Sequence, residues 1–323
     1  MKTFVTGGTG FIGGNVVKCL ISGGHEVVCL VRSASDVRGL RAAGALLAAG
    51  DVTDKPSLLS GMRGCGWVVH LAGCYDFWAR DPAVFTRVNV DGTRNVLETA
   101  LETRVSKVID VSTVATYGDA PWPATEATPM GRRWPTEYSR TKAEGERIAR
   151  RLREEKGLPL VLVHPAAVLG PHDPKPTGRY LRDLARGRMP AQVLTGHPFP
   201  FVHVRDVCQA ILRALEKPDT IGESYIVAAE NLTFGQVNGM VAELSGRRLP
   251  LITLPDFLTS AMASVLTSAS RLTRRPPWLG LSSDQVRLMR WGIEVDGSKA
   301  ARDLGIVYTP VREAIREALA ALV

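Results

Sequence analysis

Eight residues near the N-terminus, TGGTGFIG at positions 6–13, constrain the fold more than any other part of the chain. They follow a short β-type run at 2–5 and precede an apolar pattern at 15–21 with helical spacing. A strand, a glycine turn and a helix form the frame in which such glycines bind a dinucleotide. The residues of this stretch that we expect at a cofactor are Gly7, Thr9, Gly10, Phe11, Ile12 and Gly13. An ordinary glycine-rich turn is the alternative, which the strand–helix frame disfavours.

The charge of the chain is uneven. The 323 residues carry a formal net charge of +8, and 45% hydrophobic with 22% charged residues describe a globular protein. Between 247 and 290 there are seven arginines and two aspartates, which give a net charge of +5. Because no nucleic-acid-binding motif accompanies them, we expect no nucleic-acid partner. A basic rim that attracts an anionic cofactor or substrate explains the excess more simply.

The five cysteines are scattered and include no C-x-x-C pair or metal-ligand spacing. This usage is typical of reduced thiols, so we expect a cytoplasmic protein without a metal site. Glycines interrupt the N-terminal apolar run, which argues against a signal peptide. The sequence has no apolar run of about 18 residues or more, so we expect no transmembrane segment.

The first half alternates β-type and helical patterns, which predicts an α/β fold with a doubly wound parallel sheet. Strands are expected at 26–32, 45–51, 67–72, 107–112 and 160–164, and helices near 89–101 and over 136–156. Glycine and proline become frequent after the last of these strands. We therefore expect a dinucleotide-binding domain over 1–165. A smaller, mainly substrate-binding portion follows over 166–323, interleaved with a further sheet strand near 223–228.

The residue at the end of the second strand indicates the type of cofactor. A carboxylate there binds the ribose hydroxyl of NAD, whereas an arginine accommodates the extra phosphate of NADP. The chain has Arg32 at this point, so we expect NADP(H) to be preferred over NAD(H). Asp51 and Val52 close the third strand near the expected adenine. Leu71, Ala72 and Gly73 close the fourth strand, where small residues let a dinucleotide approach.

A tyrosine and a lysine in the helix at 136–156 form a second candidate group. Tyr138 and Lys142 are four residues apart and share one helix face. A cation one turn away favours the phenolate and lowers the pKa of a tyrosine toward neutral pH. Ser112 and Thr113 follow the fifth strand, at the edge where open α/β sheets bind ligands. A hydroxyl there can donate to a carbonyl oxygen that gains negative charge.

In this order and spacing, these motifs resemble those of the extended short-chain dehydrogenase/reductases, the NAD-dependent epimerase/dehydratase family. Segments 89–95, 164–171 and 201–207 extend the likeness over nearly the whole chain. Within the family, segments 78–82, 186–190 and 222–226 resemble dihydroflavonol 4-reductase-like and hopanoid-associated sugar epimerase-like proteins. The resemblance implies a Rossmann fold with a smaller C-terminal substrate-binding portion.

The resemblance also implies roles for individual residues. Tyr138 is expected to be the general acid/base, Lys142 to lower its pKa and bind the nicotinamide ribose, and Thr113 to polarise the carbonyl, with Ser112 as a second hydroxyl. Further residues expected at the cofactor are Asn89, Pro165, Ala166 and Val168. His164 stands where many relatives have arginine or asparagine. Substrate contacts are assigned to Tyr75, Phe77, Trp78, Ala115, His172 and Tyr180.

Three functions remain open at this point. The first is an NADP-dependent reductase or dehydrogenase that acts on a ketone, an aldehyde or a secondary alcohol. The second is a nucleotide-sugar epimerase or dehydratase that retains its cofactor. The third is a catalytically silent dinucleotide sensor, which the Tyr138–Lys142 pair disfavours. The substrate, the stereochemistry and the choice between monomer and homodimer are also open.

The segment 256–275 has apolar residues at helical spacing and three arginines at its end. We expect a helix whose apolar face packs on the substrate portion. A helix on a membrane surface and a mobile lid are the alternatives.

Overall fold

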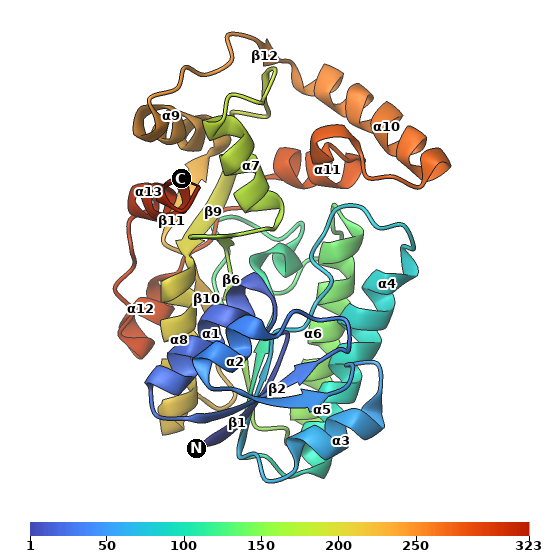
Figure 1. Cartoon of the computed structure of the whole chain (residues 1–323), viewed down its shortest axis with the longest axis vertical. Helices are drawn as coiled ribbons and strands as arrows, with labels where there is room; N and C mark the ends of the chain where they lie inside the picture. Colours follow the sequence, from blue (N-terminus) through green and yellow to red (C-terminus); the bar gives the residue numbers. More distant parts are fainter. Residues whose placement is uncertain (323) are drawn as a thin grey trace.

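The computed structural model describes residues 1–322, and a seven-stranded sheet forms its centre (Figure 1). Its spatial order is β10-β6-β5-β4-β1-β2-β3, and all neighbouring strands are parallel. The strands are β1 (Lys2–Thr6), β2 (Glu26–Val31), β3 (Leu46–Ala49), β4 (Trp67–His70), β5 (Lys107–Val111), β6 (Leu160–Pro165) and β10 (Ser224–Val227). The strand order reverses between β1 and β4, which is where such sheets bind ligands.

Helices cover both faces of this sheet, so the doubly wound α/β fold is confirmed. One layer contains α1 (Phe11–Ser22), α2 (Arg38–Ala43), α8 (Val204–Glu216) and α12 (Ser298–Leu304). The other contains α3 (Lys55–Met62), α5 (Thr93–Glu102) and α6 (Glu137–Lys156). Each layer buries an apolar cluster against the sheet, and burial of this kind provides most of the folding free energy.

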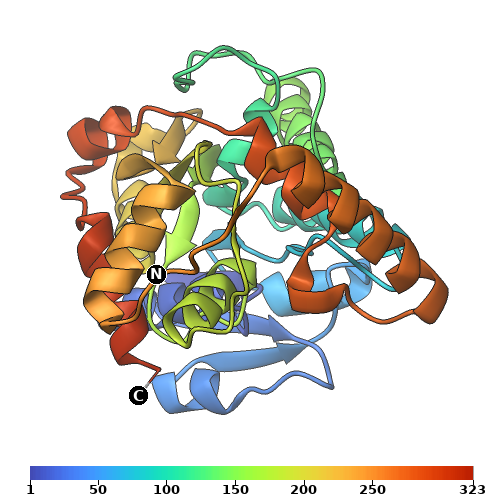
Figure 2. The same ribbon diagram turned by 90° about the horizontal axis from the view of Figure 1, so that it is seen from above.

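Most of the chain after β6, apart from α8, β10 and α12, forms a smaller layer above the carboxyl ends of the strands (Figures 1 and 2). Its sheets contain β7 (Ala167–Leu169), β9 (Pro198–His203) and β11 (Glu230–Thr233), and β8 (Gln192–Val193) with β12 (Thr253–Leu254). Its helices are α7 (Pro176–Ala185), α9 (Phe234–Ser245), α10 (Asp256–Thr273), α11 (Ser283–Trp291) and α13 (Val311–Ala320). The strand expected near 223–228 is β10, which pairs with β6 in the main sheet. The division after residue 165 stays a prediction.

The helix expected at 256–275 forms as α10, but its orientation differs from the expectation. Phe257, Val265 and Leu272 are exposed, whereas Thr259 and Ala263 are buried. The interpretation that the apolar face packs inward is therefore wrong. Small residues on the opposite side let α10 approach α11 closely, and that contact turns the apolar side chains outward.

Within residues 1–322, none of the helices is both long and apolar enough to span a bilayer. The same residues contain no group of three or more His, Cys, Asp or Glu side chains placed to hold a metal ion.

Candidate active site

The glycine turn between β1 and α1 has the backbone geometry that a pyrophosphate site needs. Gly7 has a φ of +74°, and the Gly10 N–H donates to its carbonyl at 2.9 Å. A Cβ at Gly13 would lie 2.1 Å from the Gly7 oxygen, and one at Gly7 would lie 2.7 Å from the Ala72 nitrogen. Gly10 caps α1 without a side chain, and the first turn contains no acidic residue. The N–H groups and positive dipole end of α1 therefore remain available to an anion, and this turn fits a dinucleotide.

The ends of the neighbouring strands flank this turn. Arg32 follows β2 and is exposed. Arg38, at the start of α2, is held by Asp36, with 2.7 Å between Nη2 and Oδ2. Asp51 accepts from the Thr53 N–H at 2.9 Å and shapes the turn after β3. Further site candidates lie at or near strand ends. Val52 is buried after β3, and Leu71, Ala72 and Gly73 follow β4. Pro165 ends β6, Ala166 follows it, and Val168 lies in β7 (Ala167–Leu169).

Tyr138 lies in the first turn of α6, over the carboxyl end of β5. The helix begins with a capping box, in which the Thr136 hydroxyl accepts from the Ser139 N–H at 3.0 Å. Burial raises the pKa of the Tyr138 phenol, and a hydrogen bond with Thr113 opposes the rise. Thr113 also accepts from the Ala115 N–H at 3.3 Å. Local structure thus brings Tyr138 and Thr113, the two hydroxyls expected at a carbonyl oxygen, into contact.

Lys142 lies one turn after Tyr138 in α6. Its ammonium is buried and donates to the Val111 carbonyl at 3.0 Å. The pKa of Tyr138 is raised mainly by burial, and the groups that shift it further are Tyr75, Thr113 and Cys74 rather than Lys142. The pairing of Lys142 with β5 is a contact between distant segments that helical spacing cannot predict.

Ser112 and Thr113 are neighbours in the chain, but their hydroxyls have different partners. Its hydroxyl donates to Glu146 at 2.7 Å, and Glu146 also contacts His164 at 3.0 Å and Arg150 at 2.7 Å. Burial tends to raise the pKa of Glu146, but His164, Arg150 and Ser112 together hold it below its ordinary value. This group joins α6 to β5 and β6. The Ser112 hydroxyl is therefore already bound to Glu146 of α6, in contrast to the free second donor that we expected.

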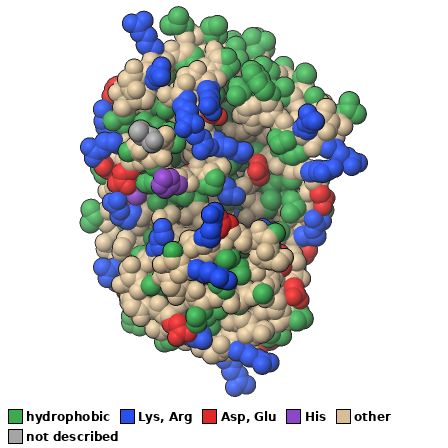
Figure 3. All heavy atoms as spheres, in the orientation of Figure 1, with side chains coloured by type: hydrophobic (Ala, Val, Ile, Leu, Met, Phe, Trp, Pro, Cys, Tyr) green, Lys and Arg blue, Asp and Glu red, His purple; other side chains and the backbone are tan. Residues whose placement is uncertain are grey.

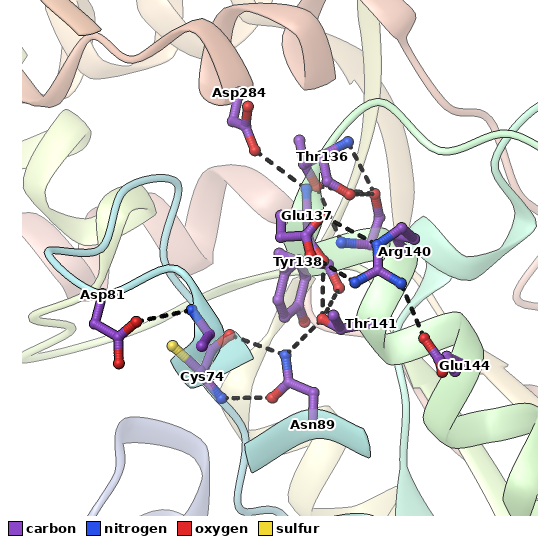
Figure 4. A network of polar contacts seen from close by, with 12 residues as sticks. Cys74, Asp81, Asn89, Thr136, Glu137, Tyr138, Arg140, Thr141, Glu144 and Asp284 are labelled. Atoms are coloured by element: carbon purple, nitrogen blue, oxygen red, sulfur yellow. Dashed lines mark hydrogen bonds and ion pairs between the residues drawn. The ribbon is translucent and has the colours of Figure 1, made fainter. Parts of the chain in front are cut away.

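Asn89 connects three segments beneath Tyr138 (Figure 4). It lies in a π-helical turn, Arg87–Gly92, between α4 (Ala83–Thr86) and α5. Its Oδ1 accepts from the Cys74 N–H at 2.7 Å, and its Nδ2 donates to the Thr141 hydroxyl at 3.0 Å. Asn89 thus holds the chain that follows β4 against α6.

The expected substrate residues divide into two groups. The Tyr75 ring lies 5.0 Å from that of Tyr138 and 5.6 Å from that of Phe77. Burial raises the pKa of Tyr75 to about 12. Trp78 is half-buried in the same segment, and Ala115 is buried in the 3-10 turn Val114–Tyr117 that follows Thr113.

The other two candidates lie elsewhere. Tyr180 donates to the Asn238 Oδ1 at 2.6 Å and packs in the core of the smaller layer, with Phe234. His172 is exposed at a φ of +60°. These contacts do not join them to Tyr138.

Two groups of contacts near the site were not predicted from the sequence. Helix α11 reaches the start of α6, where the Asp284 carboxylate accepts from the Glu137 N–H at 3.1 Å. Trp291 donates to the Gly118 carbonyl at 3.0 Å. His70, at the end of β4, lies buried between the hydroxyls of Thr6 at 2.7 Å and Thr93 at 3.1 Å. A histidine in an otherwise apolar strand was the available signal for the second of these.

The fold and this arrangement define a dinucleotide-binding α/β protein with a half-buried tyrosine–threonine pair beside the glycine turn. The chain belongs to the NAD dependent epimerase/dehydratase family, whose model matches residues 3–228. It is thus an extended short-chain dehydrogenase/reductase, an oxidoreductase family that binds a nicotinamide dinucleotide.

Three full-length similarities accompany the family match. Sterol demethylase protein B of Methylococcus capsulatus is 34% identical, over 99% of this chain and 98% of its own. A putative dihydroflavonol 4-reductase of Synechocystis is 30% identical, over 98% of this chain and 93% of its own. The crystal structure of gox2253 superposes with a TM-score of 0.85 at 34% sequence identity, and the match covers 99% of this chain and 97% of that one.

Proposed function

We propose that the protein is an NADP(H)-dependent reductase of an apolar or aromatic ketone or aldehyde, and that in the reverse direction it oxidises the secondary alcohol that such a ketone yields. The observation that carries the proposal is the contact of Tyr138 with Thr113 on one side and Tyr75 on the other. It combines a proton donor, a second hydroxyl and an aromatic wall at the edge of the sheet beside the glycine turn.

The chemistry follows from these groups. A bound reduced nicotinamide supplies the hydride for the carbonyl carbon. Thr113 donates a hydrogen bond to the carbonyl oxygen, and Tyr138 delivers the proton that this oxygen takes up. Because burial raises the pKa of Tyr138, the phenol keeps its proton at neutral pH, which favours reduction over alcohol oxidation. In this scheme Lys142 and Asn89 position the tyrosine, and the turn at Gly7, Gly10 and Gly13 receives the pyrophosphate.

The surroundings of Tyr138 favour an apolar substrate. Tyr75 presents its ring to Tyr138, and Phe77 packs against Tyr75. Aromatic surroundings of this kind suit flat apolar ligands. The names of the two similar proteins from Methylococcus capsulatus and Synechocystis refer to a sterol and to a dihydroflavonol.

A nucleotide-sugar epimerase needs cations for a diphosphate, and most candidate arginines have partners within the protein. Arg188 lies 3.7 Å from Asp183, Arg205 lies 3.0 Å from Glu317, and Arg186 donates to the Leu322 carbonyl at 3.4 Å. These pairings leave Arg179 and Arg182, which supports the reductase over the epimerase.

The preference for NADP(H) rests on Arg32, an exposed guanidinium at the end of β2 where a carboxylate would bind the ribose of NAD. Arg38 is less suited to this role because Asp36 already binds it on two nitrogens.

The test incubates the purified protein and NADPH with a panel of apolar and aromatic carbonyl compounds and, separately, with NAD and nucleotide sugars. We expect net NADPH oxidation with at least one carbonyl compound, and none with Tyr138→Phe. Epimerised nucleotide sugar without net cofactor oxidation, together with no carbonyl reduction, would overturn the proposal in favour of the epimerase. Cofactor binding without turnover in either arm would instead indicate a sensor.

A further inference from the structure

Large exposed hydrophobic side chains are concentrated in one part of the surface. Thirteen such side chains are exposed among residues 1–322, and eight of them lie between 251 and 279. The eight are Leu251, Ile252, Phe257, Leu258, Val265, Leu272, Trp278 and Leu279. Isolated exposed hydrophobic residues are ordinary, whereas a group of this size marks an interaction surface. Figure 3 shows hydrophobic side chains gathered at the upper right, over α10.

The outward orientation of this face is fixed by specific contacts on the other side of α10. The Thr267 hydroxyl accepts from the Ser283 N–H at 2.8 Å. Arg290 of α11 donates to the Ser260 hydroxyl at 3.0 Å. Ala263 and Ser270 are buried on the same side. The polar side of α10 is thus the one that the protein uses internally, and Figure 2 shows the helix at the outer edge of the molecule.

Cations flank the apolar face. Arg271, Arg274 and Arg275 are exposed at the C-terminal end of α10. A hollow of about 310 Å³ runs between α10 and α11. It is lined by hydroxyls and guanidinium groups: Ser260, Ser264, Thr267, Ser268, Ser283, Arg271, Arg287 and Arg290, with Val286. Hydroxyl and guanidinium groups together are typical donors for a phosphate.

The acidic residues of this region are already engaged, so they do not neutralise the arginines at the end of α10. Asp256 contacts His197 at 2.7 Å, and Asp284 is bound by Arg287 and the Glu137 N–H. An outward apolar face flanked by arginines without acidic partners is typical of a helix that lies in the interfacial region of an anionic membrane.

We propose that α10 and the turn Trp278–Gly280 dock on the surface of an anionic phospholipid bilayer. The apolar side chains Phe257, Val265 and Leu272 enter the boundary between headgroups and acyl chains. Arg271, Arg274 and Arg275 bind lipid phosphates, and the hollow between α10 and α11 receives one headgroup. The helix lies on the bilayer and does not cross it, in keeping with its length and apolar content.

A second copy of the chain is a poorer occupant of this face. A symmetric contact places the same patch on both partners, so it brings together two surfaces that carry the same excess of positive charge. Cores of protein interfaces are depleted of uncompensated charge, and like charges brought together oppose binding. An anionic lipid surface removes this repulsion.

The docking surface is one helix away from the catalytic tyrosine. Helix α10 packs on α11, and α11 contacts the first turn of α6 through Asp284 and the Gly118 carbonyl through Trp291. The site of Tyr138 therefore lies behind the docked helices, where it can receive apolar compounds that partition into the bilayer. The docking itself is independent of the proposed reductase activity.

The experiment measures co-sedimentation of the full-length protein with phosphatidylglycerol-containing vesicles and with pure phosphatidylcholine vesicles. We expect binding to the anionic vesicles at low salt, at least tenfold weaker binding to the neutral ones, and weakening as salt screens the arginines. Vesicles with brominated acyl chains should quench the fluorescence of Trp278, as judged against Trp278→Phe.

Two sets of variants separate the contributions. Phe257→Ser, Val265→Ser and Leu272→Ser together, and Arg271→Gln, Arg274→Gln and Arg275→Gln together, should each reduce vesicle binding at least tenfold. The matched controls are Val307→Ser, which replaces a residue that is 90% exposed elsewhere, and the triple change of the exposed Arg41, Arg63 and Arg151 to Gln. We expect these controls to bind like the unmutated protein. Thermal melting checks that every variant is folded.

Three outcomes would overturn the proposal. One is no sedimentation with either kind of vesicle. Another is loss of binding in the arginine controls equal to that in the α10 variants, which would indicate unspecific charge attraction. The third is concentration-dependent dimerisation that the α10 substitutions abolish, without vesicle binding. Inorganic phosphate distinguishes the two sources of the anion: it should compete weakly with vesicles, and binding of phosphate alone would leave a free-anion site instead.

Discussion

The ring of Tyr75 lies edge-on against the ring of Tyr138, with 5.0 Å between the ring centroids and 61° between the ring planes. The contact joins the segment after β4 to the helix that carries the proposed acid. It keeps water from one side of the phenol, and burial is the main cause of the raised pKa of Tyr138. In the proposed site, Tyr75 therefore forms part of the substrate wall and also influences the pKa of Tyr138.

Replacing this wall should affect substrate binding more than chemistry. We expect Tyr75→Ala to raise KM for an aromatic ketone about tenfold, which corresponds to the loss of an aromatic pair, while kcat changes less. Tyr75→Phe retains the ring and is the control, with KM close to that of the unmutated protein. Steady-state kinetics with NADPH in excess measure both. A large fall in kcat with KM unchanged in Tyr75→Ala would contradict a binding role.

Tyr138→Phe removes only the phenolic hydroxyl. We expect kcat for carbonyl reduction to fall by about 10²–10⁴ or more, with the Kd for NADPH retained. Thr113→Ala should lower the rate by about 10²–10³, the range for a donor to a developing oxyanion. Since burial keeps the phenol protonated, kcat in the unmutated protein should stay level through neutral pH and fall only at alkaline pH. Near-normal turnover in Tyr138→Phe would require a different acid.

Cofactor preference depends on Arg32. We expect the unmutated protein to bind NADPH more tightly than NADH, and Arg32→Ala to lose that difference because a 2′-phosphate contact is removed. Salt should weaken NADPH binding more than NADH binding. Arg38→Ala is the matched control, since Asp36 already holds that guanidinium. Titration of both cofactors by fluorescence gives the dissociation constants, and equal values in the unmutated protein would refute the assignment.

Local sequence patterns were sufficient for much of the fold. The glycine turn, the strand positions and the start of α6 at Thr136 depend on neighbours in the chain, so periodicity and capping residues reveal them. Thr113 lies close to Tyr138 because β5 ends, and the helix that crosses over to β6 begins, at the same edge of the parallel sheet.

Contacts between distant segments were not accessible in this way. Ser112 looks like a second catalytic hydroxyl in the sequence, and only packing shows that Glu146 binds it. The spacing Lys142, Glu146, Arg150 does indicate one helix face, yet the partner His164 comes from another strand. The apolar pattern at 256–275 correctly predicted the helix α10. Periodicity shows which residues share a helix face, but it does not show whether that face points to the protein or to solvent. Small residues at Ala263 and Ser270 decided that direction.

Glu146 should be important for stability. Its side chain is 2% exposed and is paired with Arg150 and His164. Glu146→Gln keeps the shape but removes the charge, and breaking a buried pair costs about 3–5 kcal/mol. Because the folded-state pKa lies below the unfolded value of 4.5, this stabilisation is complete above that pH and is lost as pH falls through the folded pKa. Urea denaturation measures the change. Glu144→Gln, which breaks a partly exposed pair with Arg140, should cost under about 1 kcal/mol.

His70 gives the chain a second, separate dependence of stability on pH. Its ring is fully buried between Thr6 and Thr93, and burial, followed by the charge of Lys142, lowers its pKa from 6.5 to about 3. The Thr93 hydroxyl donates to the Asn89 carbonyl, so it accepts from Nε2–H, and Thr6 donates to Nδ1. The neutral ring therefore links the end of β1, beside the glycine turn, to α5.

The sign of the effect follows from proton binding. Between pH 6.5 and about 3 the unfolded chain binds a proton at this histidine that the folded chain does not bind. The free energy of unfolding should therefore fall with decreasing pH, by up to about 1.4 kcal/mol per pH unit from this residue. The stabilisation is complete above pH 6.5 and is lost progressively below it.

Urea denaturation at several values between pH 5 and 7 avoids the range in which Glu146 titrates. We expect His70→Gln to flatten the slope there, while His172→Asn, at an exposed histidine, leaves it unchanged. Equal slopes in His70→Gln and the unmutated protein would show that another group causes the dependence.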